Sequence, residues 1–381
     1  MKYNFDEIIN RQHDQYSYSL KWSDLKDNEH ICLQTADMDF KTTPEVIAAM
    51  HKVADHGVYG YSGINDEYRE AHVNWFASRH NWHFNKEDLY FVHGTHTGVI
   101  ECMKRFTNEG DGVIVLLPSY NYHHDIEPHK RKFVGVDMKE NNGYYTIDFD
   151  ALEKACADEN NTMFIICHPH NPTGRVWNEE ELLKMAEICR KYNVLMVTDE
   201  VHCDIIRKDV KFKPMMSVVG TKGIIALTAI NKTFNLAGLS MSSIIVCDDE
   251  LKKAFENYFA LPSPFGVAAG IAAYNEGGAW VDELNEYLDR NLDFADTFIK
   301  EHLPKAKCLK PEGSYIIWID FSGYNLTDED IHTRIYDEAK VILQPGSAFD
   351  APDYYQRVCL SSPYSMIKEA FERIAEAFKN A

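Results

Sequence analysis

Four side chains whose types suit chemistry on a small ligand stand just after apolar runs of the chain. They are Tyr120, Asn171, Asp199 and Lys232. An amine can act as a nucleophile and move protons, a carboxylate can hold positive charge, an amide can donate hydrogen bonds, and an aromatic ring can stack on a flat ligand. Open α/β sheets bind ligands at the C-terminal ends of their strands. These positions therefore predict a single site at one edge of a sheet.

Five short apolar runs are the strands expected to position these side chains. None of them alternates polar and apolar residues, as is typical of strands covered by helices on both faces. Between two of the runs, apolar residues at near-helical spacing follow Asn178, a suitable N-cap, and predict a crossover helix over 178–193. This alternation predicts an α/β domain with a largely parallel sheet. The five runs are 112–118, 162–169, 193–200, 223–230 and 242–247.

The rest of the chain is expected to form an arm and a second, smaller domain. Residues 1–45 show no convincing element before Thr43 and Pro44, a helix-start signal, so they predict an arm that packs with the small domain. After Gly277 and Gly278, a long amphipathic helix, an apolar strand and a terminal helix predict an α+β domain. We place the domains at 1–45, 46–280 and 281–381, with a hinge near 276–285.

Composition and charge exclude several classes of protein. With 39 basic and 59 acidic side chains, the net charge of −20 repels phosphate backbones and anionic lipids. No apolar run approaches the ~20 residues of a membrane span, and the first residues resemble no export signal. The 9 cysteines form no CxxC pair, and the 17 histidines show no HxxxH or HExxH spacing. We therefore expect a cytoplasmic enzyme with reduced thiols that binds no nucleic acid, membrane or metal.

Six motifs occur in a recognisable order along the chain. They are ADMDF at 36–40, GVYGYS at 57–62, HNPTGRVW at 170–177, DEVHCD at 199–204, NKTFNLAGL at 231–239 and PEGSYIIWIDF at 311–321. Together they resemble the aspartate-aminotransferase-like superfamily of pyridoxal-phosphate enzymes, fold type I (class I/II), and within it the cystathionine β-lyase-like branch of C–S lyases. The resemblance covers essentially the whole chain. It implies a large cofactor-binding domain with a mostly parallel mixed sheet and a smaller C-terminal α+β domain.

The resemblance implies a role for each of the four side chains at the strand ends. Lys232 would bond the aldehyde of pyridoxal 5′-phosphate and, once freed by the substrate, move the proton on the substrate Cα. Asp199 would keep the pyridine nitrogen protonated, and Asn171 would donate to the 3′ oxygen of the ring. Tyr120 would stack on the ring, with Tyr122 as its rival for that place.

Further positions match the family more loosely. Thr95 and His96 open an amphipathic stretch whose helix start would hold the phosphate, and Thr228 is a candidate for the same shell. Tyr61 resembles the tyrosine that reaches the phosphate of the neighbouring subunit, which implies a homodimer with a shared active site. His202 would orient Asp199 or cover the ring, or it would be a core histidine.

The resemblance assigns substrate binding to Arg357. It matches the arginine that clamps the substrate α-carboxylate, a task suited to a planar bidentate donor. The chain departs from most aminotransferases of this fold, since it lacks the SxSK serines and has Ser240 where they carry an arginine. It also departs after Arg357, where relatives more often show Arg-x-Asn and then Pro-Arg.

The resemblance implies a C–S β-lyase that cleaves L-cystathionine or related S-substituted cysteines by α,β-elimination to a thiol, pyruvate and ammonia. Two other functions stay open. The same lysine could serve an aminotransferase, and the fold could serve a regulatory or binding protein whose catalysis is vestigial. Release of thiol and pyruvate without a keto acid would distinguish the lyase from both.

Overall fold

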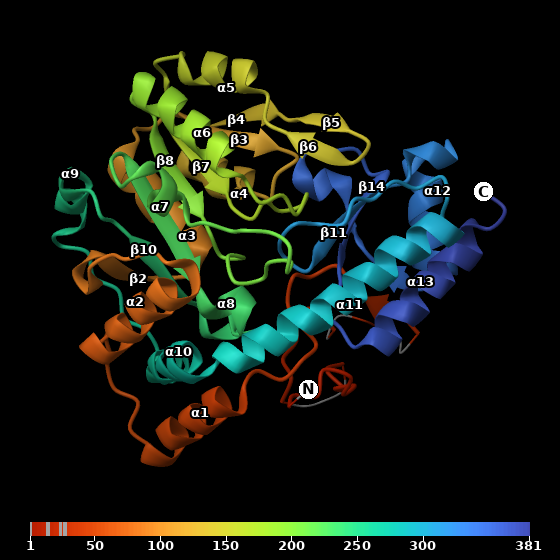
Figure 1. The fold of residues 1–381 in the computed structure, drawn as a ribbon, viewed down its shortest axis with the longest axis horizontal. Helices are drawn as coiled ribbons and strands as arrows, with labels where there is room; N and C mark the ends of the chain where they lie inside the picture. The colour runs from red at the N-terminus through yellow and green to blue at the C-terminus, as the bar shows by residue number, and fades with distance from the viewer. Residues whose placement is uncertain (1, 13–15, 23–24, 26–28) are drawn as a thin grey trace.

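The core of the structure, a computed structural model that describes residues 2–12, 16–22, 25 and 29–381, is a seven-stranded sheet (Figure 1). Its strand order is β2-β10-β9-β8-β7-β3-β4. All neighbours pair in parallel except β10, which is antiparallel to both β2 and β9. The strands are β2 (Leu89–His93), β3 (Gly112–Leu117), β4 (Lys132–Asp137), β7 (Asn161–Cys167), β8 (Leu195–Asp199), β9 (Ile224–Ala229) and β10 (Met241–Ile245).

Helices cover both faces of this sheet, which explains why its strands are apolar throughout. Along β9, Ala226 packs in the core on one face, whereas its neighbours Ile225 and Leu227 pack in the core on the other. The first face is covered by α2 (Asp66–His80), α5 (Phe149–Cys156), α6 (Glu179–Lys191), α7 (Met215–Val219) and α10 (Pro264–Glu276). The second is covered by α3 (Thr95–Phe106) and α4 (His123–Ile126).

The predicted α/β class is confirmed, and each of the five expected runs overlaps one strand of the sheet. The crossover helix is also present as α6, where the Asn178 side chain accepts from the Glu181 backbone N–H and the Glu181 side chain accepts from that of Asn178. The sequence analysis missed β2 and β4. In β4, at the sheet edge, Val136 is the one buried residue, so it lacks a continuous apolar run.

The C-terminal part forms a second layer around α11 (Gly278–His302) and α13 (Tyr364–Phe378). A small sheet lies against them, with β11 (Ile316–Asp320) and β13 (Gln344–Pro345) both antiparallel to β14 (Tyr355–Cys359). Residues 276–285 contain a helix junction, because α10 ends at Glu276 and α11 begins at Gly278. Leu288 of α11 packs in the large core and Leu292 in a second core, so this one helix joins the two parts (Figure 1). The predicted domain boundaries stay a prediction.

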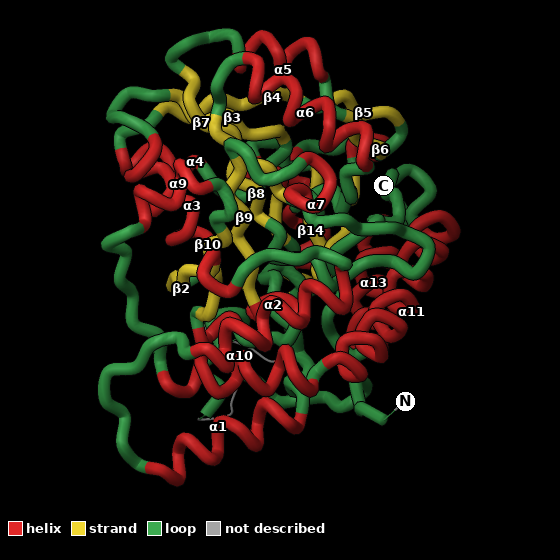
Figure 2. The backbone as a smooth tube through the Cα atoms, turned by 60° about the vertical axis from the view of Figure 1, so that its left-hand side comes forward, coloured by secondary structure: helices red, strands yellow, loops and turns green. Residues whose placement is uncertain are grey.

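The N-terminal segment touches both parts of the molecule. Its strand β1 (Ile31–Cys32) pairs in parallel with β12 (Val341–Ile342) of the C-terminal part. Phe5 and Phe40, by contrast, pack in the large core. After this segment, α1 (Pro44–His56) begins at the expected signal, with Thr43 as N-cap, and lies beside α10, which separates it from α2 (Figure 2).

The remaining elements are short connections. They are the hairpin of β5 (Lys139–Asn141) and β6 (Tyr144–Thr146), and the helices α8 (Ile230–Thr233), α9 (Asp249–Lys252) and α12 (Asp328–His332). All 9 cysteines are free thiols, and 7 of them are buried. Within the described ranges, no helix is both long enough and apolar enough to cross a membrane.

Candidate active site

A cavity of about 290 Å³ lies at the C-terminal ends of β7, β8 and β9, beside the start of α3. We call it the reaction cavity. Seven of the predicted site residues line it together, although the chain separates them widely. They are Thr95, His96, Tyr120, Asn171, Asp199, His202 and Lys232.

Lys232 enters the reaction cavity from α8, which directly follows β9. Its Nζ donates to the Ala36 carbonyl oxygen at 2.7 Å, and the Tyr315 hydroxyl donates to the same oxygen at 3.0 Å. Burial, followed by the positive charge of Arg357, lowers the pKa of the Lys232 amine. A lowered pKa increases the fraction of neutral amine, which is the nucleophilic form.

Asp199 ends β8 and is buried, with 6% of its surface exposed. Its carboxylate accepts from the Tyr122 hydroxyl at 3.1 Å and from the Val201 backbone N–H at 3.2 Å, both neutral donors. Burial raises the pKa of Asp199, against the opposing effect of His96. A cationic ring nitrogen placed in the cavity would supply the charge that this carboxylate lacks.

The first turn of α3 offers a place for an anion. Its N-cap is Gly94, at φ 89°, which has no side chain to cap the free backbone N–H groups. Within that turn, His96 Nδ1 pairs with the Asp125 carboxylate of α4, and its ring lies 5.3 Å from that of Tyr120. Burial opposes protonation of His96, but the pairing with Asp125 outweighs it and raises the pKa. A cationic imidazole and free N–H groups suit a phosphate.

Arg357 and Asn171 form the side of the site that faces the C-terminal part. Arg357 lies on β14, is 1% exposed, and donates to Asn171 Oδ1 at 3.3 Å and to the Gln34 carbonyl at 2.6 Å. It also pairs with Gln344 Oε1. Its Nε has no hydrogen-bond partner within the described part of the chain. A buried guanidinium N–H without a partner suits an incoming carboxylate.

Three predicted residues are placed differently from the rest. The Nδ1 of His202 pairs with Ser314 Oγ at 3.0 Å, so that nitrogen faces Ser314 instead of orienting Asp199. Thr228 lies outside the reaction cavity, because its side chain points to the α2 face of the sheet and pairs with His72 at 3.1 Å. Tyr61 is 97% exposed on the single chain and is no part of the cavity lining.

Two supporting residues were missed by sequence reasoning. Tyr122 was considered only as a stacking ring or a core residue, yet its hydroxyl holds Asp199. Asp125, the partner of His96, was not considered. Both lie in the loop and short helix that follow Tyr120. Residue spacing in such a segment does not show which way their side chains point. The signal available was their position: a polar run, 119–125, directly after a buried strand.

Elsewhere, one group of side chains has the composition of a metal site. The ligand atoms of His80, Cys203 and Asp204 lie within 4.8 Å of one another. Asp204, however, already accepts from His80 at 2.7 Å, from Trp75 at 3.1 Å and from Thr233 at 2.9 Å. Burial also raises the pKa of the Cys203 thiol, which disfavours the thiolate that a metal needs. His80 and Asp204 therefore already serve as each other's partner.

The reaction cavity therefore combines a buried amine, a carboxylate, an aromatic ring and an anion-binding helix start. Each has a counterpart in pyridoxal phosphate: the aldehyde, the ring nitrogen, the ring face and the phosphate. Among the described residues, Asp199 forms no direct ion pair and the start of α3 has no side-chain cap, and pyridoxal phosphate would supply a partner to each. The residues present fit the group.

Comparison with known proteins gives the same picture along the whole chain. A family model described as aminotransferase class I and II matches residues 28–374. The chain is 35% identical to cystathionine beta-lyase PatB of Bacillus subtilis (strain 168), over 98% of this chain and 99% of that protein.

Solved structures agree with this result. The PLP-bound C-S lyase from Staphylococcus hominis, complexed with L-cycloserine, matches with a TM-score of 0.94 and 33% identity over 99% of this chain and 100% of the other. Cystalysin from Treponema denticola, which contains a pyridoxal 5′-phosphate cofactor, matches with a TM-score of 0.94 and 32% identity, over 100% of both chains.

Proposed function

We propose, from the premise that this chain belongs to the aminotransferase class I and II family, in its pyridoxal-phosphate-dependent C–S lyase branch, that it cleaves the Cβ–S bond of L-cystathionine or related S-substituted cysteines. One water is consumed, and the products are a thiol, pyruvate and ammonia. The observation that carries this proposal is the convergence of Lys232, Asp199 and Tyr120 on one cavity.

Pyridoxal phosphate, when bound, withdraws electrons from the substrate Cα, so that the Cα proton and then the sulfur on Cβ can leave. Lys232 is the group in the cavity suited to carry that proton, because its amine is buried and has a lowered pKa. Asp199 would hold the positive charge of the ring nitrogen, and Tyr122 would hold Asp199. Asp199 and Tyr122 are both buried, and burial strengthens the interaction between them.

Arg357 is proposed to bind the substrate α-carboxylate. Its Nε, which has no hydrogen-bond partner among the described residues, and its hydrogen bond to Asn171, which lines the reaction cavity, support this role. Gln34 and Gln344 would keep the guanidinium in place. With the carboxylate held there, the Cα of the substrate would be directed toward the Lys232 side of the cavity.

The shared active site of a homodimer is a further part of the proposal. Tyr61 lies in a loop with other exposed apolar residues, Val58 and Tyr59, and Phe259 is 79% exposed. The same loop is tied to a second one, since Ser62 Oγ donates to the Pro262 carbonyl at 2.6 Å. Exposed apolar surface of this kind is typical of a contact between proteins. Tyr61 would reach the phosphate held by the partner subunit.

The test is to incubate cofactor-loaded protein with L-cystathionine and no keto acid while following thiol and pyruvate. We expect both to rise in step. Amino-group transfer only after a keto acid is added would instead indicate an aminotransferase, and silence in both assays would favour a binding role.

Replacing the amine tests the residue assignment. Lys232→Ala should abolish release of thiol and pyruvate and should remove the visible absorbance of the lysine-bound cofactor, because no other amine lines the reaction cavity among the described residues. Lys222→Ala is the matched control, since its lysine lies at the opposite end of β9. Full turnover by the Lys232→Ala protein would contradict the assignment.

A further inference from the structure

One backbone carbonyl holds the Lys232 amine. Lys232 Nζ donates to the Ala36 carbonyl oxygen at 2.7 Å, and among the described residues this is the one hydrogen bond of the amine. A carbonyl oxygen accepts but does not donate, so it binds an N–H group and leaves the lone pair of a neutral amine free to take up a proton. The Tyr315 hydroxyl donates to the same oxygen at 3.0 Å. The position of this oxygen therefore sets where the amine lies.

The contact with Ala36 becomes stronger when the amine takes up a proton. In the proposed reaction, the C–H bond at the substrate Cα breaks, an N–H bond forms on Lys232 Nζ, and the electron pair of the broken bond stays with the substrate. The lysine is then an ammonium, and a hydrogen bond from a charged donor is about twice as strong as one between neutral groups. An acceptor that is already in place stabilises this charge without having to move. The step should therefore depend on how firmly the Ala36 carbonyl is held.

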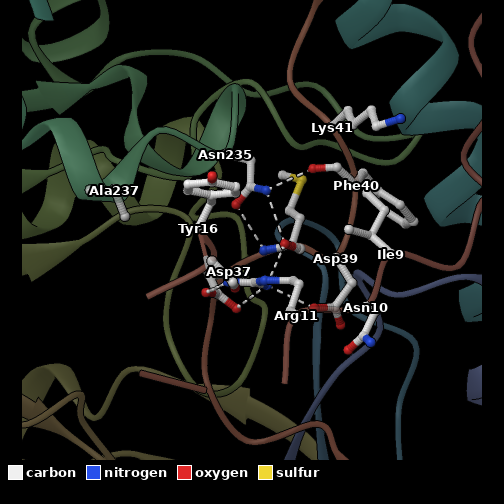
Figure 3. Close-up of a pocket in the computed structure, with 13 residues that line it drawn as sticks. Ile9, Asn10, Arg11, Tyr16, Asp37, Asp39, Phe40, Lys41, Asn235 and Ala237 are labelled. Carbon is white, nitrogen blue, oxygen red and sulfur yellow. Dashed lines mark hydrogen bonds and ion pairs between the residues drawn. The ribbon is translucent and has the colours of Figure 1, made fainter. Parts of the chain in front are cut away.

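Ala36 begins a strap of residues 36–41, to which Asn235 makes three hydrogen bonds (Figure 3). Asn235 Oδ1 accepts from the Met38 backbone N–H at 2.9 Å, and Nδ2 donates to the Met38 and Phe40 carbonyls, each at 2.9 Å. Along the chain, Asn235 follows Lys232 by three residues. One amide side chain thus ties the strap that carries the acceptor to the loop that carries the amine.

Further side chains bind the strap from other parts of the chain. Arg11, of the N-terminal segment, donates to the Met38 carbonyl at 2.9 Å and pairs with two carboxylates of the strap (Figure 3). Ser361, of the C-terminal part, donates to the Asp37 carbonyl at 3.0 Å. None of these contacts involves the loop that carries the amine. They hold the strap on the molecule, but they do not set its distance from the lysine.

We propose that Asn235 is a positioning residue for the proton-transfer step. By fixing the strap, it keeps the Ala36 carbonyl where that oxygen holds the Lys232 amine and stabilises the ammonium that forms there. The proposal rests on the proposed function, in which Lys232 carries the Cα proton, and it adds a residue that is no part of the reaction cavity lining. Loss of the Asn235 amide should slow the proton transfer and leave binding of the substrate carboxylate by Arg357 nearly unchanged.

The test variant is Asn235→Gly in the cofactor-loaded protein. The backbone at Asn235 has φ 57°, which glycine adopts without strain, so the change removes the amide and keeps the loop. With L-cystathionine and no keto acid, we expect kcat to fall about tenfold and KM to stay within about twofold. Asn193→Gly is the matched control with wild-type kcat, because Asn193 also has φ 57°, is exposed, and precedes β8 at the sheet end opposite the reaction cavity.

Two further readouts need no cleavage of a C–S bond. In heavy water, the loaded protein should exchange the Cα hydrogen of L-alanine, which has no leaving group on Cβ, for deuterium, and NMR should show this exchange slowed about tenfold in Asn235→Gly. In the protein without cofactor, backbone hydrogen exchange over residues 36–41, measured by mass spectrometry, should become faster in Asn235→Gly because the Met38 N–H loses its acceptor.

The outcomes separate this proposal from the proposed function. Wild-type rates of Cα exchange and thiol release in Asn235→Gly would overturn the role of Asn235, and so would equal losses in Asn193→Gly. Unchanged hydrogen exchange of the strap would overturn it as well. A wild-type protein that exchanges the Cα hydrogen but releases no thiol would overturn the proposed function alone, and one that does neither would overturn both.

Discussion

At the scale of single residues, the site depends on pairs in which one side chain holds another in place by a hydrogen bond or an ion pair. Tyr122 holds Asp199, Asp125 holds His96, and Asn171 accepts from Arg357. In each pair the first residue was either missing from the sequence analysis or assigned another role, whereas the second was proposed from its motif or position. The structure therefore adds most at the supporting residues. Among them, the effect of Asp125 on His96 is the easiest to isolate by mutation.

Asp125→Asn should weaken cofactor binding in a pH-dependent way. Pairing with Asp125 raises the pKa of His96 above its ordinary value of about 6.5, so His96 stays protonated at higher pH in the wild type. Its attraction for a phosphate is present below the raised pKa and is lost as the pH rises through it. In the variant this loss comes earlier, so the affinity should fall about tenfold near pH 8 and little near pH 6.

The measurement is the dissociation constant of pyridoxal phosphate, followed by its absorbance at both pH values. Asp350→Asn is the matched control, because Asp350 pairs with His123 at 3.4 Å, outside the reaction cavity. Parallel pH profiles for the wild type and Asp125→Asn would show that Asp125 does not act through the charge of His96.

At the scale of elements, α10 packs closely on α2. It also contacts β10, which lies next to the edge strand β2 of the main sheet. A Cβ added at Gly270 would lie 2.5 Å from Cε2 of Tyr68, whose ring is 1% exposed and has little room to move. Glycine costs a helix about 1 kcal/mol relative to alanine, so its presence here reflects contact and not propensity.

Gly270→Ala should lower the free energy of unfolding by about 1–2 kcal/mol, because the overpacking cost exceeds the gain in helix propensity. Urea unfolding followed by circular dichroism measures this change. Gly63→Ala is the control, since no atom lies within 4 Å of the added Cβ. A more stable Gly270→Ala protein would mean that the two helices can separate without cost.

At the scale of the whole molecule, buried charges join the N-terminal segment to both parts of the fold. Asp39 accepts from Lys21 at 2.7 Å, from Trp22 at 2.8 Å and from Ser362 at 2.6 Å, so one carboxylate ties together residues far apart in the chain. Burial would raise the pKa of Asp39, but Lys21 and its other partners outweigh burial, and the pKa is lowered.

Lys21→Met should destabilise the protein by about 3 kcal/mol at pH 7, because it removes one partner of a buried ion pair. The Asp39 contribution is present above the unfolded pKa of about 3.9 and is lost as the pH falls through the lowered folded pKa. The difference between wild type and variant should therefore shrink below about pH 4. Unfolding at several pH values measures it, with Lys130→Met, in an exposed pair with Glu109, as a control near zero.

The sequence by itself determined the fold class, five of the seven strands of the main sheet, the crossover helix and the positions of Lys232, Asp199, Asn171 and Tyr120. These follow from local signals, since apolar runs, caps and motifs depend on neighbours along the chain. The weakly apolar edge strand β4 carried no such signal, and the antiparallel direction of β10 depends on how its connection crosses the sheet.

Only the tertiary structure decided which way side chains point and which distant segments meet. Thr228 shows the first case, because alternation along β9 directs it to the α2 face and away from the reaction cavity. Arg11 and Asp37 show the second, since their pairing depends on how the N-terminal segment folds back beside the loop after Lys232. Such contacts depend on how the elements pack together, so residue spacing along the chain does not predict them.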